Sequence, residues 1–309
     1  MQVRIRIAPI IVLAAGMVLM LCNPASATRL ALVVGNSDYA HAGYLPNPTN
    51  DAHLIASVLE DAQFDVILGI DLERRDFEQA IRDFSRRLPD IDIALFYFAG
   101  HAVQVEEENY LLPVDAELRD ITDVDFESVS FNTVLRQMQR TQSLTRTNLV
   151  FLDACRDNPF IRRFADNTRG IAVGDGLARS RANVGTLLAF STQPGNVAVD
   201  GLGENSPFTG ALAKWLRNPG LEIRQVLTRV RGEVVTETNG QQVPWDDSSL
   251  LADVYLFGDT GTAPASPTQI APSTPGSDAP QRPAQDQAGE RQTPATTPTE
   301  SPRFLPPPP

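Results

Sequence analysis

The sequence predicts an α/β domain built on a mostly parallel β-sheet with helices on both faces. Three observations support this fold class. Continuous apolar runs alternate along the chain with amphipathic stretches, the order expected of alternating strands and helices. The runs are apolar at successive positions, which is typical of strands covered on both faces. The chain has 309 residues, of which 42% are hydrophobic, enough for one large core or two small ones.

The first 27 residues have the features of a secretory signal peptide. Arg4 and Arg6 make a positive start, and residues 7–21 form an apolar run that is short for a membrane span. The small residues Ala25-Ser26-Ala27 then supply a cleavage site. We therefore expect a cleavable signal peptide at residues 1–27 and a secreted or periplasmic protein. An uncleaved membrane anchor is the alternative.

The first half of the remaining chain contains three predicted strands and two predicted helices. The strands are apolar runs at residues 29–35 (RLALVVG), 64–70 and 91–98 (IDIALFYF). The first helix follows a turn at 46–50, is capped by Thr49 or Asn50, and runs from 51 to 61. The second, at 72–88, carries apolar residues at helical spacing, namely Phe77, Ala80, Ile81 and Phe84.

The second half begins with a polar loop and a short edge strand at 110–113. Further strands are expected at 147–152 (TNLVFL), 186–191 (TLLAFS) and 252–257. Helices are expected at 131–141, at 207–216 after Ser206 as N-cap, and at 221–238.

Two segments differ from this pattern. Residues 157–183 are rich in Arg, Gly, Asp and Asn without a sustained period, which predicts a long mobile loop. Residues 259–309 hold 13 of the 24 prolines and are rich in Pro, Thr and Ser, so we expect a disordered tail that acts as a spacer or a docking segment.

The charge of the chain excludes one class of partner. The sequence has 26 basic and 38 acidic residues, and removal of the signal peptide takes away two arginines and no acid, leaving a net charge of −14. A strongly acidic protein repels phosphate backbones, which argues against nucleic-acid binding. No further segment is long and apolar enough to cross a bilayer, so we expect no membrane association after signal cleavage.

Cysteine usage is unusual for an exported protein. The sequence contains only Cys22 and Cys155, and Cys22 leaves with the signal peptide. The remaining chain cannot form an internal disulfide, although exported proteins usually keep cysteines for that purpose. Cys155 is therefore either an inert buried thiol or a chemically employed one.

His101 and Cys155 each follow a predicted strand. The carboxyl ends of neighbouring parallel strands share one edge of a sheet, so these residues would meet there although 54 positions separate them. An imidazole beside a thiol can take its proton and return it to a leaving amine. No third polar residue is evident to orient His101. The other two histidines, His41 in a loop and His53 on a helix, are interpreted as surface or packing residues.

The segments YFAGHAVQ and FLDACRDNPF resemble the histidine and cysteine motifs of the caspase and metacaspase superfamily, in particular its bacterial caspase-like (orthocaspase-type) members. The interval between the two residues agrees with a caspase spacing of about 50. Further similar segments, together spanning about residues 29–258, are VVGNSDY, NPTNDA, NYLLPVDA, AFSTQPG and SPFTGALAKWL. The resemblance implies a three-layer caspase-like fold over residues 28–258, with a mostly parallel six-stranded sheet and helices on both faces.

The resemblance also implies a function, that of a cysteine-type endopeptidase acting on proteins or peptides. Cys155 aligns with the nucleophile and His101 with the general acid/base. The backbone N–H groups of Cys155 and Ala102 would form the oxyanion hole, with Ala102 standing where the family usually has Gly.

By the same resemblance, two acids shape the pocket for the P1 side chain of the substrate. Asp153 aligns with the acidic residue two positions before the metacaspase nucleophile, and Asp51 aligns with its partner on the first helix. Carboxylates at both positions would select Arg or Lys by charge-assisted hydrogen bonds. Ser191, within AFSTQPG, is assigned as a further substrate-binding residue. The alternative for Asp51 is a stabilising charge at a helix N-terminus.

A second function stays open on the sequence. Arg156 and Asp157 follow the cysteine where the family has other residues, so a catalytically weak peptide-binding or scaffold module with a Pro-rich tail is the alternative. We expect no required cofactor or metal, since no His/Cys cluster has ligand spacing. The acids between 115 and 127 leave calcium activation open, with a solvated acidic loop as the simpler interpretation. Arginines 162, 163, 169, 179 and 181 are candidate sites of self-cleavage.

Overall fold

The computed structural model describes residues 27–140, 146–154, 173–174, 177–178, 180–194, 196, 198 and 203–258. The chain divides into two units, 1–265 and 266–309, and every described residue belongs to the first. The predicted signal segment up to residue 26, the predicted tail and Cys155 lie outside the described residues.

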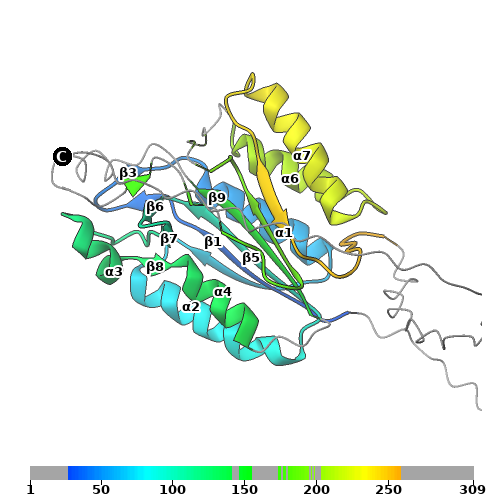
Figure 1. The fold of residues 1–309 in the computed structure, drawn as a ribbon, viewed down its shortest axis with the longest axis horizontal. Coiled ribbons are helices and arrows are strands. Elements are labelled where there is room, and N and C mark those ends of the chain that lie inside the picture. The colour runs from blue at the N-terminus through cyan, green and yellow to red at the C-terminus, as the bar shows by residue number, and fades with distance from the viewer. Residues whose placement is uncertain are drawn as a thin grey trace, which may run out of the picture. The chain divides into compact units, whose positions relative to one another are not determined.

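A six-stranded sheet forms the centre of the described domain (Figure 1). Its order is β12-β11-β9-β5-β1-β4, and every neighbouring pair is parallel except β11 and β12. The strands are β1 (Arg29–Gly35), β4 (Asp65–Ile70), β5 (Ile93–Gly100), β9 (Thr147–Ala154), β11 (Thr186–Phe190) and β12 (Trp245–Ser248). The predicted fold class is confirmed.

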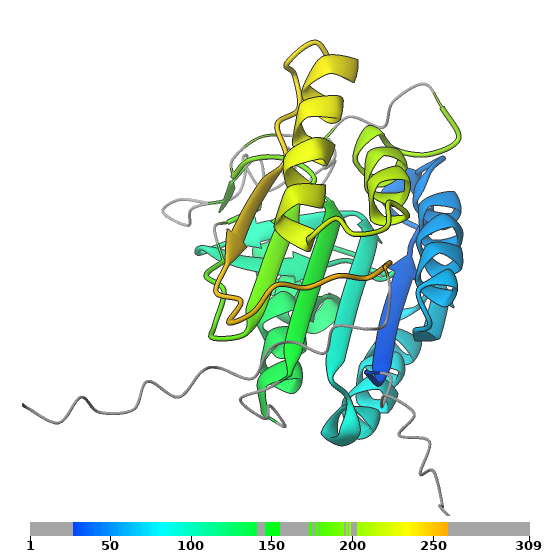
Figure 2. The same cartoon turned by 90° about the vertical axis from the view of Figure 1, so that its right-hand side faces the viewer.

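Helices cover both faces of this sheet (Figures 1 and 2). On one face lie α1 (Pro48–Asp61), α6 (Pro207–Leu216) and α7 (Ile223–Glu237), and on the other α2 (Arg74–Arg87) and α4 (Phe131–Arg140). Alternate residues of β1 enter different apolar clusters, with Ala31 and Val33 in the first and Leu32 and Val34 in the second. Because both faces are buried, every position of such a strand is apolar.

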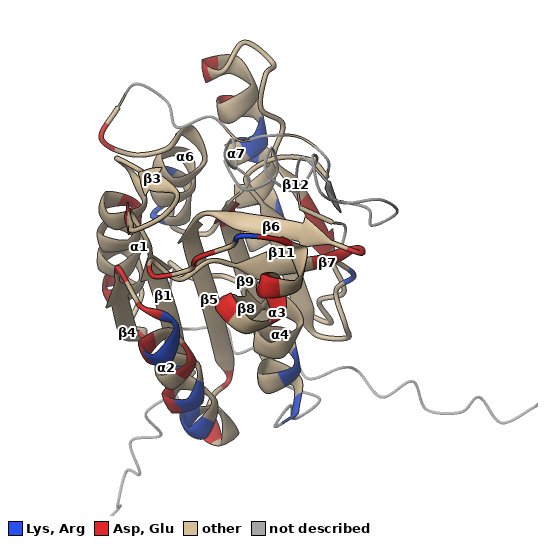
Figure 3. Cartoon of the chain, turned by 90° about the vertical axis from the view of Figure 1, so that its left-hand side faces the viewer, with Lys and Arg blue, Asp and Glu red and all other residues tan. Residues whose placement is uncertain are grey.

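The helix α2 carries residues of both charge signs along its length (Figure 3). Arg74 pairs with Glu78 across 3.2 Å and Arg86 with Asp83 across 2.8 Å, at spacings of four and three residues. The apolar residues Phe77, Ile81 and Phe84 of the helix are buried. The predicted amphipathic helix is therefore present, shortened at its start to Arg74.

A second, four-stranded sheet has the order β10-β6-β7-β8. It consists of β6 (Ala102–Val105), β7 (Glu108–Leu111), β8 (Val129–Ser130) and β10 (Val173–Gly174). The expected polar loop after β5 is thus a hairpin, whose turn residues Glu106 and Glu107 have φ of 48° and 65°. The short edge strand expected at 110–113 is shifted to β7 and does not belong to the central sheet.

Short elements complete the described domain. A small hairpin joins β2 (Asp38–Tyr39) to β3 (Gly43–Tyr44), and α3 (Val124–Glu127) precedes β8. Two 3-10 helices, η1 and η2, span Leu88–Asp90 and Ile121–Asp123. The loop expected at 157–183 contains β10, while most of it lies outside the described residues.

The start of α1 differs from the prediction. The helix begins at Pro48 with Asn47 as N-cap, rather than after Thr49 or Asn50. Proline suits the first turn because its missing N–H has no intrahelical partner there. Gly35 ends β1 against this turn, where a Cβ would lie 2.3 Å from the Pro48 carbonyl oxygen. This close approach brings the helix onto the end of the strand.

The last predicted strand, 252–257, is wrong. Its alternation is real, since Val254 and Leu256 are buried in the core beside α6 and α7 while Tyr255 is 47% exposed. Its backbone, however, bonds to the segment that leads into α7, with the Val254 carbonyl accepting from Ile223 N at 2.9 Å and the Phe257 carbonyl from Gly220 N at 3.0 Å. The sixth strand is β12, whose polar sequence WDDS lacks the apolar pattern that predicts a strand. In the part of the chain that the structure describes, no helix is long and apolar enough to span a membrane.

Candidate active site

The strands β5 and β9 end side by side at one edge of the sheet, directly before the two predicted catalytic positions. They are parallel neighbours, and their register pairs Gly100 with Ala154. His101 directly follows the first of these residues and Cys155 the second. Cys155 itself lies outside the described residues, so the structure places His101 and the residue that precedes the cysteine.

His101 is held on a tightly bonded backbone. Its side chain is buried, with 2% of the residue exposed. The His101 N–H donates to the Tyr39 hydroxyl at 2.8 Å, and the Leu112 N–H donates to the His101 carbonyl at 3.0 Å. The Tyr39 and His101 ring centroids are 4.7 Å apart, with the rings tilted by 57°. A polar residue that contacts the histidine therefore exists, although sequence reasoning missed it within the segment VVGNSDY.

Gly100 makes room for this arrangement. Its φ is +152°, and a Cβ at this position would lie 2.5 Å from the Tyr39 hydroxyl oxygen and 3.0 Å from Phe98 Cζ. Only glycine leaves space for the hydroxyl to reach the backbone of the next residue. The glycine before His101 is thus required by the approach of Tyr39.

Asp51 and Asp153 come from different elements and share one neighbour. Asp51 lies in the first turn of α1 and Asp153 next to the last residue of β9, and they are 0% and 1% exposed. The Ser206 N–H donates to Asp51 Oδ1 at 3.0 Å, and the Ser206 hydroxyl donates to Asp153 Oδ2. The Asn205 side chain adds a 2.9 Å hydrogen bond to Asp51 Oδ1. Ser206 therefore bridges two buried carboxylates.

The N-terminus of α6 completes this carboxylate cluster. Ser206 is the N-cap of the helix, as predicted, and its hydroxyl accepts from Thr209 N at 3.0 Å. The Thr209 hydroxyl donates to Asp153 Oδ2 at 2.7 Å and is 2.6 Å from the Tyr97 hydroxyl oxygen. Among the described residues, no hydrogen-bond partner reaches Asp153 Oδ1. Asp153 Oδ2 thus accepts hydrogen bonds from Ser206 and Thr209, and Oδ1 is available to a further donor.

Ala102 and Ser191 lie near the ends of β5 and β9. Ala102 begins β6, is 4% exposed, and contributes its methyl group to the same apolar cluster as Ala154. Ser191 follows β11, is fully buried, and donates through its hydroxyl to the Ala154 carbonyl at 3.3 Å. Gln242 in turn donates to the Ser191 carbonyl at 2.8 Å. Both residues thus adjoin the position from which the chain continues to Cys155.

The acids considered for calcium perform local tasks. Asp120 and Asp123 form the capping box of η2, and hydrogen bonds from Thr122 lower the pKa of Asp120. Asp115 accepts from Arg74 N at 2.9 Å, and Asp125 accepts from the Tyr110 hydroxyl at 3.0 Å. Within the described ranges, no group of three or more His, Cys, Asp or Glu residues is placed to hold a metal ion.

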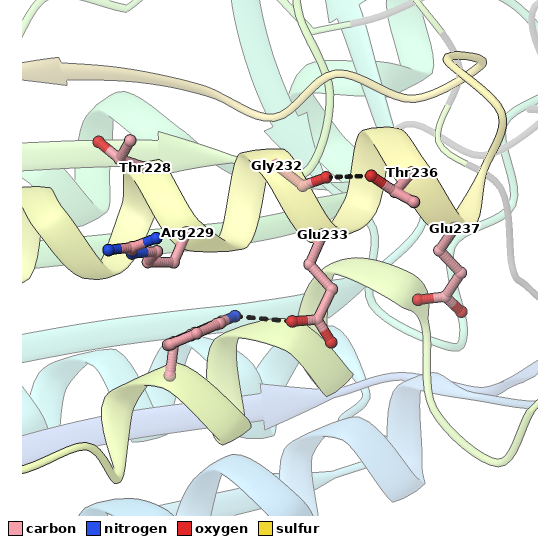
Figure 4. A pocket seen from close by; sticks show the side chains of 7 residues that line it. Thr228, Arg229, Gly232, Glu233, Thr236 and Glu237 are labelled. Atoms are coloured by element: carbon pink, nitrogen blue, oxygen red, sulfur yellow. Dashed lines mark hydrogen bonds between the residues drawn. The ribbon is translucent and has the colours of Figure 1, made fainter.

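A groove of about 620 Å³ runs along α6 and α7 (Figure 4). Trp215 donates through its indole N–H to Glu233 at 2.7 Å, and Arg229 lies over the Trp215 ring at 5.8 Å. Its lining residues are Trp215, Thr228, Arg229, Gly232, Glu233, Thr236 and Glu237. None of the described residues predicted for catalysis or substrate binding lines this groove.

A six-stranded, mostly parallel sheet with helices on both faces places the domain in the class of caspase-like α/β folds. Within that class, residues 28–255 match the family model described as the caspase domain, peptidase family C14. Because this match covers more than half of the chain, the chain belongs to the caspase-domain family.

Two curated relatives are similar to the chain. The human mucosa-associated lymphoid tissue lymphoma translocation protein 1 is 25% identical over 204 residues, which are 66% of this chain and 23% of that protein. The mouse homolog of that protein is 26% identical over 250 residues, or 79% of this chain and 28% of that protein. The chain spans about a quarter of the length of these relatives.

Proposed function

We propose that the protein is a cysteine endopeptidase in which Cys155 is the nucleophile and His101 the general acid/base. The observation that carries the proposal is the register of β5 and β9, which pairs the residues immediately before the two catalytic positions. Family membership supports a peptidase of the caspase type. His101 is buried, and both its backbone N–H and its carbonyl are hydrogen-bonded. These features support a fixed base rather than a mobile surface imidazole.

The chemistry follows from these two side chains. The His101 imidazole takes the proton of the Cys155 thiol, and the thiolate attacks the carbonyl carbon of the scissile bond. The backbone N–H groups of Cys155 and Ala102 would stabilise the oxyanion. The imidazolium then protonates the leaving amine as the C–N bond breaks, which leaves the acyl group on Cys155 as a thioester. Water, deprotonated by His101, attacks this thioester and releases the carboxylic acid and the Cys155 thiol.

Cleavage after Arg or Lys is the finer part of the proposal. Asp51 and Asp153 place two carboxyl groups in a buried site, and a cationic substrate side chain that entered it would form charge-assisted hydrogen bonds with them. Asp153 Oδ1 is the acceptor that the described residues leave available. Ser191, whose hydroxyl bonds to the chain just before Cys155, is proposed to line the same pocket.

The test is cleavage of fluorogenic peptides that end in Arg, Lys or Asp, with and without calcium. Wild type should cleave after Arg or Lys, and Cys155→Ala and His101→Gln should not. Asp153→Asn should lower kcat/KM for the Arg peptide about a hundredfold, the loss expected for hydrogen bonds to a charged group. Asp76→Asn, an exposed acid on α2, is the matched control and should leave cleavage unchanged. Cleavage after Asp alone would overturn the basic specificity.

A catalytically weak peptide-binding module is the second candidate. It is favoured by the burial of both pocket acids and by Ala102, whose methyl occupies a position that is usually glycine in the family. This candidate predicts that the basic peptides bind, as measured by fluorescence polarisation, but are not cleaved in either the presence or the absence of calcium. Asp153→Asn would then weaken binding of the basic peptides, and neither the wild type nor this variant would cleave them.

Two further proposals concern processing. We propose that residues 1–27 direct export, which N-terminal sequencing of the exported protein would test by locating cleavage after Ala27. We also propose self-cleavage after an arginine between 157 and 183. In that case Cys155→Ala should stay intact under conditions that fragment the wild type, and equal fragmentation of both would refute it.

A further inference from the structure

Tyr39 follows the end of β1 and contacts His101 at the edge of the sheet where β5 ends. It is the second residue of β2, pairs with Gly43 of β3, and is 5% exposed. Its ring belongs to a small apolar cluster that also contains Val103 and Leu112. Packing alone would explain the ring but not the position of the hydroxyl group.

The hydroxyl closes a ring of hydrogen bonds around His101. It accepts from the His101 N–H at 2.8 Å and donates to the Leu112 carbonyl at 3.2 Å. The Leu112 N–H donates to the His101 carbonyl at 3.0 Å, so both backbone groups of His101 are bonded within one triangle of residues. Asn36 also donates to the Leu112 carbonyl, at 3.0 Å, and thereby anchors the triangle to the end of β1.

The Tyr39 ring acts on the side chain rather than on the backbone. Its centroid lies 4.7 Å from that of the imidazole, at the separation of interacting aromatic pairs. A ring at this distance occupies space into which the imidazole would otherwise rotate. The hydroxyl and the ring therefore constrain different degrees of freedom of the same residue.

We propose that Tyr39 is a positioning residue for His101, whose hydroxyl fixes the histidine backbone and whose ring fixes the imidazole orientation. The inference rests on the proposed function only in so far as His101 is the general acid/base. The contacts themselves involve neither the substrate nor the proposed carboxylate pocket. Loss of positioning should consequently lower kcat and leave KM nearly unchanged.

Two variants separate the two roles. Tyr39→Phe keeps the ring and removes the hydroxyl, and we expect kcat to fall about tenfold. Tyr39→Leu removes both, and we expect a fall of about a hundredfold, the cost of a misplacement on the order of 1 Å. Tyr44→Phe is the matched control, since Tyr44 lies on the neighbouring strand β3 and is 67% exposed.

A spectroscopic readout makes the test independent of turnover. The His101 imidazole protons should experience the ring current of Tyr39, and their NMR signals are assigned by comparison with His101→Gln. Tyr39→Phe should preserve these chemical shifts approximately and Tyr39→Leu should move them. Thermal unfolding of each variant shows that it is folded, and if Tyr39→Leu does not fold, the kcat and shifts of Tyr39→Phe decide.

The outcomes distinguish this inference from the proposed function. Unchanged kcat in both Tyr39 variants, or a raised KM at constant kcat, would overturn the positioning role. Imidazole chemical shifts that stay unchanged in Tyr39→Leu would also overturn it. If the wild type cleaves no peptide, the proposed function fails, and the chemical shifts still decide whether Tyr39 holds the imidazole.

Discussion

Replacement of Gly100 by alanine tests the packing on which the candidate site depends. The added Cβ would lie 2.5 Å from the Tyr39 hydroxyl oxygen and 3.0 Å from Phe98 Cζ, so neighbours must move. Overpacking of this kind costs about 1–3 kcal/mol. The φ of +152° lies in a region that is nearly confined to glycine and adds about 1–3 kcal/mol. We therefore expect the free energy of unfolding to fall by about 2–6 kcal/mol.

The assay is urea denaturation followed by far-ultraviolet circular dichroism and tryptophan fluorescence. With a slope of about 2–3 kcal/mol per molar urea, the midpoint should fall by about 1 M or more. Gly232→Ala is the control, because Gly232 lies within α7 and, apart from its chain neighbours and the helix's own nearby backbone, no heavy atom lies within 4 Å of the added Cβ. There alanine should raise stability by about 0.5–1 kcal/mol.

The two glycines thus predict opposite signs for the same chemical change. Gly100→Ala should also lower kcat, because the displaced Tyr39 hydroxyl no longer holds the His101 N–H. Wild-type stability in Gly100→Ala would refute the contact geometry around the histidine. Wild-type kcat in a destabilised variant would refute the link between this contact and catalysis.

Three further predictions concern other parts of the domain. Ser206→Ala removes both a helix N-cap and a donor to a buried carboxylate, so urea denaturation should show a loss of about 2–4 kcal/mol, which Ser206→Thr should largely restore. The hydrogen bond from Lys214, partly opposed by burial, lowers the pKa of Glu233 below its ordinary 4.5. The Glu233 carboxylate therefore stabilises the fold above pH 4.5, and this contribution is lost as pH falls through the lowered pKa. Glu233→Gln should lower the free energy of unfolding by about 0.5 kcal/mol at neutral pH. A loss that persisted in strong acid would contradict the assignment. Burial and the hydrogen bond to Asp125 raise the pKa of Tyr110 to about 12, so ultraviolet titration of Tyr110→Phe should lack a late-ionising tyrosine, and loss of an early one instead would refute the assignment. The stability linked to Tyr110 is present below pH 10 and declines as pH rises toward 12.

The hydrophobic pattern of the sequence was sufficient to predict an element's bounds where burial is uniform along that element. The strand at 29–35 and the helix at 207–216 have the predicted bounds, and Ser206 is the predicted N-cap. In the strand both faces are covered, and in the helix the cap is a local hydrogen bond. Neither signal depends on contacts from distant parts of the chain.

Periodicity failed where backbone pairing rather than side-chain burial defines the strand. β12 has the sequence WDDS, lies at the edge of the sheet and pairs with β11, so its side chains carry little apolar signal. Residues 252–257 alternate like a strand because Val254 and Leu256 pack in the core with α6 and α7. The backbone of this segment forms an isolated bridge, between Tyr255 and Glu222, rather than a ladder. Sequence patterns report burial, and here burial and pairing are separate.

The candidate site divides in the same way. The sequence by itself determined that His101 and Cys155 each follow a strand, and the family resemblance singled out Asp51 and Asp153. Only the tertiary structure decided that β5 and β9 are neighbours, that Ser206 joins the two acids, and that Tyr39 contacts the histidine. The physical reason is distance along the chain. Hydrophobic period and capping act within a few residues, whereas these hydrogen bonds join residues 53 to 155 positions apart, through the close packing of strands and helices around one core.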